Sequence, residues 1–495
     1  MFVGKLHSQC HVQSSRRRSI YRAFMLVVGF TSLMSCQSTG GWHMDTLAIE
    51  YRGLWQSNGY GYFIDASGPT LKAYNITADV CVRDSDIEEV FYSYASQQIE
   101  GGELVATADG QYLYLKEPFE EYQMQLTRLD RLPAQCRHLT ENTPMANFDA
   151  LSSYMQTHYA FFELYGVDWP KTVASYRPKV TDTTSEADLF RLFSDMLAPI
   201  QDAHVSLRGI IDGDEVSYEP EISPLGKATQ TIAEQLNTSK DNIDEKLLEH
   251  YWVNDIHQEI LQGQGVMAAN DWIQYGIVDQ DIGYMAIAST YDYAGGGIND
   301  NANTRRQLKQ VLDQALMLFN DRSVKAVLLD LSINFGGHSF PAMDIAARFA
   351  TRPTQAFSKK AYDAVGLNAF PIQVTPTHQQ SEEQPYFHGP VYVLASSATV
   401  SGGEEVVLAL RALPNVTVMG ERTRGALSDI LEKTLPNGWR IGLSNEIYMD
   451  ENDDVWEGDG IPPDVEMPVF DPNNPFKGHL EAVNQVIENI HNERS

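Results

Sequence analysis

Hydrophobic and polar positions divide the chain into three parts with different periodicity. Over residues 46–140, short runs of alternating apolar and polar residues are separated by turn signals. Asp109-Gly110, for example, separates Glu103–Thr107 from Gln111–Leu115. The many aromatic residues of this part favour packing within a sheet rather than a ligand groove. We therefore expect a small all-β domain here.

Helical spacing begins at about residue 146. Apolar residues recur every three or four positions, at Phe148, Leu151, Met155, Tyr159 and Phe162. A second helix is predicted over about Glu186–Leu197. Together these patterns predict a helical subdomain over residues 146–207. Residues 208–275 are polar without a clear period, and we interpret them as an inserted segment.

From about Gly276 the pattern alternates between strands and helices. Ile282–Ile287, Val324–Leu331 and Val391–Ala395 are apolar enough for buried strands, the last two parallel. Thr304–Asn320 is amphipathic with a helical period. Asn437-Gly438 predicts a hairpin, and residues 473–495 a closing helix. The sequence thus predicts an α/β core over residues 276–472.

The first 36 residues have the pattern of a targeting segment. The basic run Arg16–Arg18 precedes the apolar run Ala23–Met34, which is too short to span a bilayer well. Leu33-Met34-Ser35-Cys36 resembles a bacterial lipobox, which would make Cys36 the lipidated residue. Gln37 after it favours an outer-membrane lipoprotein facing the periplasm. A cleaved signal peptide and an uncleaved anchor are the alternatives, and residues 37–45 form a short linker.

Composition excludes some functional classes and constrains the cysteines. The net charge of −30 would repel nucleic acid and anionic lipid, so we expect membrane contact only through a lipid anchor. No Cys-x-x-Cys or His-Glu-x-x-His pattern occurs, so no metal or cofactor is expected. Cys81 and Cys136 remain as a plausible disulfide in an oxidising compartment.

Ser401 is the candidate nucleophile. It follows the apolar run Pro390–Ala395 and a stretch of small residues, and it precedes an amphipathic helix. A serine hydroxyl needs a base and donors for the developing oxyanion. Gly402-Gly403 allow a substrate carbonyl to approach the backbone, and the helix directs its positive end at the site. The same pattern also suits a tight turn in which Ser401 caps the helix.

Three further segments supply candidate partners. The strand Leu329–Leu331 runs into the Gly336-Gly337 loop, which can present an N–H group to an oxyanion. His204 follows a helix, and imidazole is the usual base for serine, although a lone histidine is often structural. Glu457 begins a Gly/Pro-rich segment and could orient the base. Structural turns explain the two glycine-rich segments equally well.

Taken in order, these motifs resemble the tail-specific, or C-terminal processing, peptidases and their tricorn and interphotoreceptor retinoid-binding relatives. The resemblance covers roughly residues 146–207 and 276–470. The family's DLRxNxGG is similar to Asp330–Gly337, with Ser332 in place of Arg. Its S-x-x-E is similar to Ser401–Glu404, its GExTxG to Gly420–Gly425, and its ExxGIxPD to Glu457–Asp464.

The resemblance implies an α/β core of the crotonase-like spiral type with an N-terminal helical subdomain. It also implies peptide hydrolysis through an acyl-enzyme, with Ser401 as nucleophile and His204 as base. The oxyanion would bind at Gly402 and Gly337, with Gly336 adjacent, and Glu457 would be the distal acid. Ala426 stands where serine–lysine members carry lysine, which points to the tricorn-like branch with a histidine base.

Two departures leave other readings open. Ala203 replaces the serine that links Glu to His in tricorn, and Ser332 replaces the usual Arg. A catalytically silent carrier of hydrophobic ligands on the same fold is therefore an alternative, as is a scaffold lipoprotein whose β domain recruits a partner. If the chain is an enzyme, its partner is a peptide or protein substrate. Relatives form oligomers, so a homo-oligomer is a further expectation.

Overall fold

The computed structural model describes residues 47–493, apart from 221–228, 230–231, 235–236 and the single residues 298, 365, 382, 472 and 475. The predicted leader with Cys36 and the linker 37–45 lie outside the described residues. Within the described part, every helix is too short or too polar to cross a membrane.

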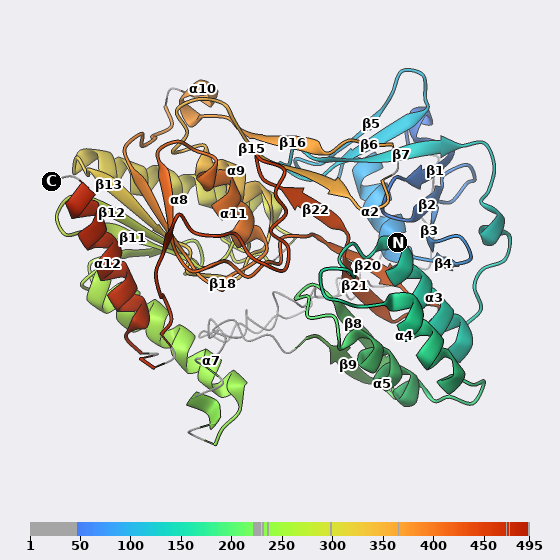
Figure 1. Ribbon diagram of the computed structural model, residues 1–495. Helices are drawn as coiled ribbons and strands as arrows, with labels where there is room; N and C mark the ends of the chain where they lie inside the picture. Colours follow the sequence, from blue (N-terminus) through green and yellow to red (C-terminus); the bar gives the residue numbers. More distant parts are fainter. Residues whose placement is uncertain are drawn as a thin grey trace, which may run out of the picture.

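The N-terminal domain is built on an antiparallel seven-stranded sheet of order β4-β3-β2-β1-β7-β6-β5 (Figure 1). A 3₁₀ turn, Ile49–Tyr51, precedes it. The strands are Leu54–Ser57 (β1), Tyr62–Asp65 (β2), Lys72–Ile76 (β3), Cys81–Arg83 (β4), Glu103–Ala106 (β5), Tyr112–Lys116 (β6) and Gln123–Leu129 (β7). The predicted Asp109-Gly110 turn joins β5 to β6. A disulfide joins Cys81 of β4 to Cys136 in the 3₁₀ helix Ala134–Arg137.

The prediction that this domain is all-β was wrong. Helix α2, Ser85–Ala95, lies between β4 and β5 and buries Phe91 and Tyr94. Asp84 caps it by accepting from the N–H groups of Asp86 and Ile87. Aromatic and β-branched residues in this segment favour a strand locally. Burial of one helical face against the sheet outweighs that preference.

The helical subdomain contains α3 (Pro144–His158), α4 (Trp169–Tyr176) and α5 (Glu186–Leu197), with the 3₁₀ turn Arg177–Lys179 after α4. It packs on a four-stranded sheet of order β20-β21-β8-β9. These strands are Ile430–Thr434 (β20), Arg440–Ser444 (β21), Ser206–Ile211 (β8) and Asp214–Tyr218 (β9). The predicted Asn437-Gly438 hairpin joins β20 to β21.

Residues 208–275 are not one inserted segment, contrary to the prediction. Their beginning forms β8 and β9, and their end forms β10 (Val266–Ala268) and the start of β11 (Ile273–Val278), which belong to the core sheet. Between them lie α7 (Lys240–Glu249) and the π-helix His250–Ile260. Strand β8 pairs with β21, more than 200 residues later. A local pattern cannot reveal so distant a partner.

The α/β core has a seven-stranded sheet of order β10-β11-β12-β13-β17-β19-β23, parallel from β12 onward. Its other strands are Ile282–Ile287 (β12), Ala326–Asp330 (β13), Val391–Ala395 (β17), Val416–Gly420 (β19) and Val465–Glu466 (β23). Every residue of β12, β13 and β17 is buried. The helices are Asn301–Asp321 (α8), Phe340–Ala346 (α9), Thr377–Gln380 (α10), Gly402–Arg411 (α11) and Gly478–Glu493 (α12).

Two smaller sheets complete the molecule. Strands Thr354–Ala361 (β15), Phe370–Val374 (β16) and Glu446–Met449 (β22) form one of them, which runs from the core toward the N-terminal domain (Figure 1). Strands Ile333–Asn334 (β14) and Ala398–Thr399 (β18) form the other and lie next to the candidate site. Figure 1 shows the core on one side, with the N-terminal domain and the helical subdomain on the other.

Candidate active site

Ser401 lies between β18 and α11 in a strained backbone conformation. Its φ is 53° and its ψ is −126°, a combination that residues other than glycine rarely adopt. Its N–H group donates to the Glu404 carboxylate over 3.1 Å. Strain of this kind persists only where the surroundings enforce it, and it concentrates at functional sites.

Glu404 is the group that enforces the strained backbone conformation of Ser401. This fully buried carboxylate accepts from the Thr423 hydroxyl (2.6 Å) and from the N–H groups of Gly425 (2.7 Å) and Ala426 (2.8 Å). Burial raises the pKa of Glu404, while these hydrogen bonds lower it. One side chain thus ties the Ser401 elbow to residues 423–426. Sequence reasoning did not give Glu404 a role, although an acid three residues after a capping serine is a known helix-start signal.

The glycine loop lies directly beside Ser401. Strand β14 pairs in parallel with β18. A Cβ on Gly336 would lie 2.7 Å from Ser401 Cβ, and a Cβ on Gly402 would lie 3.2 Å from the Gly337 nitrogen. In the described part of the chain, the N–H groups of Gly337 and Gly402 donate to no other group. Two donors without an acceptor in this part of the chain therefore lie side by side next to Ser401.

His204 lies in a buried turn between α5 and β8. Its backbone N–H donates to Asp202 Oδ1 (2.9 Å), and the Tyr159 hydroxyl donates to Asp202 Oδ2 (2.9 Å). Burial lowers the pKa of the imidazole, although Asp202, Asp429 and the Ser428 backbone oppose this. The ring is therefore neutral near pH 7, as a general base must be.

The structure ties Ser401 and His204 to the same loop without bonding them to each other. No hydrogen bond joins their side chains among the described residues. Glu404, beneath Ser401, holds Gly425, and the Ser428 backbone interacts with His204. The segment from Gly425 to Ser428 can span at most about 11 Å. The loop over residues 425–428 thus links the two groups.

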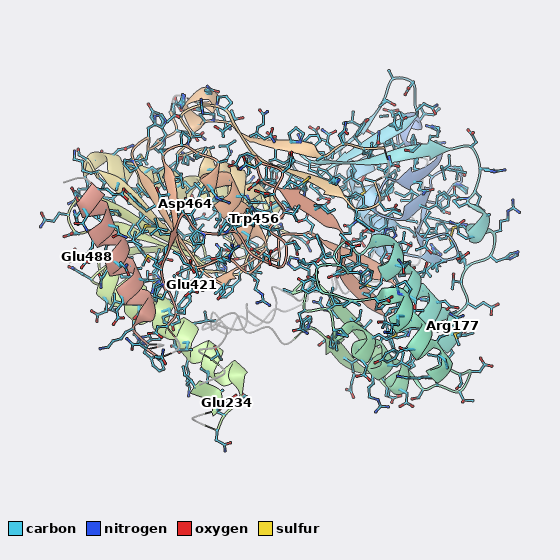
Figure 2. The ribbon with its side chains drawn as sticks, in the orientation of Figure 1. Arg177, Glu234, Glu421, Trp456, Asp464 and Glu488 are labelled. Carbon is cyan, nitrogen blue, oxygen red and sulfur yellow. A yellow bond between two sulfur atoms is a disulfide. The ribbon has the colours of Figure 1, made fainter. Side chains whose placement is uncertain are left out.

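Among the described residues, no hydrogen bond joins Glu457 to the imidazole. Its Oε2 accepts from the N–H groups of Leu427 (2.9 Å) and Ser428 (3.0 Å), and its Oε1 is buried without a hydrogen-bond partner in the same part of the chain. Burial and the charges of Asp202 and Glu404 raise its pKa well above the ordinary value. Glu457 thus supports the loop behind the imidazole. Figure 2 shows its neighbour Trp456 on the core and Arg177 across the molecule on the helical subdomain.

Asp330, at the end of β13, has a histidine partner that the sequence did not indicate. It accepts from the Ser332 hydroxyl (2.5 Å), the Tyr284 hydroxyl (2.6 Å) and His479 Nε2 (2.9 Å). His479 belongs to α12, 149 residues later. The position that departs from the family motif, Ser332, is therefore part of a closed buried network that leads into the Gly336-Gly337 loop.

Among the described residues, no group of three or more His, Cys, Asp or Glu side chains is arranged to hold a metal ion.

Two family models match the sequence. The model described as peptidase family S41 matches residues 281–467, and the model described as the tricorn protease C1 domain matches residues 140–198. These ranges contain Ser401, the glycine loop and the helices that precede His204. The core of this chain, residues 281–467, belongs to peptidase family S41. The resemblance predicted from the motifs is thereby confirmed, and this S41 peptidase is an enzyme of the serine type.

Solved structures resemble this S41 peptidase over most of their length. A candidate peptidase from Parabacteroides merdae ATCC 43184 is 25% identical, with 70% of this chain and 96% of that chain covered and a TM-score of 0.52. A lipoprotein from Streptococcus agalactiae is 16% identical (70% and 98% covered, TM-score 0.42). Mature CPAF in complex with lactacystin is 11% identical (70% and 98% covered, TM-score 0.48). No curated protein matches the sequence.

Proposed function

We propose that this S41 peptidase hydrolyses peptide bonds through an acyl-enzyme, with Ser401 as nucleophile and His204 as general base, on a core of the crotonase-like spiral type. The observation that carries the proposal is the strained Ser401 elbow beside two unused N–H donors, those of Gly337 and Gly402. Strain, an adjacent positive helix end and paired donors together fit an acyl-transfer site better than a simple helix cap.

The chemistry follows from these groups. Neutral His204 takes the proton from Ser401 Oγ as the oxygen attacks the scissile carbonyl carbon. The resulting oxyanion accepts hydrogen bonds from Gly337 and Gly402, and Gly336 keeps the loop close. His204 then returns the proton to the leaving amine. Water attacks the acyl-enzyme by the same route and releases the second product.

The imidazole must move toward Ser401, or Ser401 toward it, when substrate binds. Catalytic hydrogen bonds are often long before substrate is present and tighten in the complex. Residues 425–428 are the natural place for this adjustment, because Glu404 and Glu457 hold that loop from its two sides. Glu457 therefore supports the site through the loop, and Asp202 orients the turn that carries His204.

The lipobox supports a further part of the proposal. Lipidation at Cys36 would anchor this peptidase to the outer membrane, facing the periplasm. Intact-mass spectrometry of protein from bacterial membranes would show the added acyl mass. A Cys36→Ser variant that fractionates with the membrane unchanged would contradict it.

Ser401→Ala is the direct test of the nucleophile. The variant should lose labelling by a fluorophosphonate probe, and hydrolysis of casein-derived peptides should fall by about 10⁴-fold or more. Ser397→Ala is the matched control, because Ser397 is a half-buried serine of the same segment with no role in the proposal. Labelling that survives in Ser401→Ala, or disappears in Ser397→Ala, would overturn the assignment.

A further inference from the structure

Arg424 is a half-buried arginine in the loop that Glu404 ties to the Ser401 elbow. It lies between Thr423 and Gly425, which both donate to Glu404, and its own N–H donates to the Thr399 carbonyl over 2.9 Å. Within the described residues, its guanidinium forms no hydrogen bond or ion pair. A guanidinium offers five donors in a fixed plane, and withdrawing them from water without a partner is costly.

Tyr165 is a second unpartnered donor on the neighbouring loop. It follows α3 and is half-buried, and its hydroxyl bonds to no described residue. Gly458 brings the two loops together: its N–H donates to the Gly425 carbonyl over 2.7 Å, and a Cβ placed on it would lie 2.6 Å from Leu164. Arg424 precedes Gly425 in the chain, and Tyr165 follows Leu164. The two residues therefore flank Gly458. Each also influences the other's pKa.

The nearby acids do not use these donors. Glu404 is occupied by one hydroxyl and three N–H groups. Asp202 is occupied by the His204 N–H and the Tyr159 hydroxyl. The guanidinium interacts with the charges of Glu404 and Asp202, but within the described residues its five N–H groups have no hydrogen-bond acceptor.

We propose that Arg424 and Tyr165 form a carboxylate-binding subsite beside Ser401 that selects peptides with a negative charge near the cleaved bond. The guanidinium would bind the carboxylate in a bidentate manner and the phenol would donate a further hydrogen bond. The carboxylate belongs either to the C-terminus of the peptide or to an Asp or Glu side chain. This inference rests on the proposed function only for its location at the cleavage site.

A purely structural role makes a different prediction. If Arg424 only neutralised Glu404 and Asp202, its loss would weaken binding of every peptide equally. Recognition of a carboxylate requires the loss to depend on the charge of the peptide. The ratio of affinities for charged and uncharged peptides therefore separates the two roles.

The test measures peptide binding to the full chain carrying Ser401→Ala, so that it does not depend on turnover. Fluorescence polarisation would compare fluorescein-labelled random hexapeptide pools ending in a free acid or in an amide. Amidated pools with Glu fixed at one position in turn would distinguish a side chain from the C-terminus. Arg424→Gln and Tyr165→Phe are the test variants. Arg422→Gln is the control, because Arg422 donates to the Gly460 carbonyl instead.

We expect a charged pool to bind about 10- to 100-fold more tightly than the neutral pool, a preference that Arg424→Gln abolishes and Tyr165→Phe reduces. Arg422→Gln should keep the preference for the charged pool. Equal midpoints of thermal unfolding for all variants should confirm that they are folded. Equal binding of charged and neutral pools, or an equal loss for both in Arg424→Gln, would overturn the proposal. If discrimination holds while the wild type hydrolyses nothing, the catalytic proposal fails and the subsite stands.

Discussion

The buried His479 should make the stability of this peptidase depend on pH in the alkaline range. His479 is fully buried, with Nε2 2.9 Å from Asp330 Oδ2 and Nδ1 3.6 Å from Asp255 Oδ2. Burial disfavours the charged ring, but Asp330 and Asp255 outweigh it and raise the pKa of His479 to about 9. The imidazolium is therefore part of the native structure at neutral pH.

The size of the effect follows from this pKa. Raising an imidazole pKa from its ordinary 6.5 to about 9 corresponds to roughly 3 kcal/mol of native-state stability. Because the pKa is raised in the folded state, this contribution is complete below pH 6.5 and disappears as the pH rises through 9. Asp330 ends the strand that leads to the Gly336-Gly337 loop, so the loss should also loosen the candidate oxyanion site.

Guanidinium unfolding of the wild type and His479→Gln at pH 6 and pH 9.5 measures this contribution. The free energy of unfolding should be higher for the wild type than for His479→Gln. This difference should be roughly 3 kcal/mol larger at pH 6 than at pH 9.5. Taking the difference cancels other groups that titrate there, such as Glu446, whose pKa burial raises to about 8. His491→Gln, at a more exposed position of the same helix, is the control for the loss of a histidine from α12. A wild-type advantage over His479→Gln that is equal at both pH values would refute the reasoning.

Three further predictions concern the site and the N-terminal domain. Glu404→Gln replaces an acceptor of four hydrogen bonds, so kcat/KM should fall by at least about 10-fold with a smaller effect on KM; unchanged kinetics on casein-derived peptides would contradict this. Because burial lowers the pKa of His204, the acid limb of the kcat/KM profile should lie below pH 6.5, and Asp202→Asn, which removes a charge that raises that pKa, should move the limb lower still. A limb at or above 6.5 in both proteins would exclude His204 as the base. Replacing Cys81 and Cys136 with serine should cost about 2–4 kcal/mol in urea unfolding, and dithiothreitol should affect only the wild type.

Much of the α/β core could be predicted because its strands are buried on both faces. The predicted range Val391–Ala395 coincides with β17, and Thr304–Asn320 lies within α8. Continuous apolar runs and a helical period are local properties, so they survive in the sequence. Helix α2 could not be predicted in the same way, because its residues prefer a strand and only contacts with the sheet make a helix the better solution.

The candidate site also has parts that local sequence predicts and parts that it does not. Ser401 and the glycine pair stand in motifs a few residues long, and the parallel order of β13 and β17 brings them together. His204 was predicted as a base from its residue type and from a family motif. Glu457 was predicted as the distal acid without a settled link to His204, and its hydrogen bonds come from the N–H groups of Leu427 and Ser428.

The sequence by itself determined which residues are buried in strands, where the backbone turns at glycine, and which serine precedes a helix. It determined these because each depends on neighbours within about ten positions. Only the tertiary structure decided that Glu404 spans two loops, that His479 supplies the cation for Asp330, and that Arg424 and Tyr165 flank Gly458. Hydrogen bonds and charges act over a few ångströms of space, and residues so placed can be any number of positions apart along the chain.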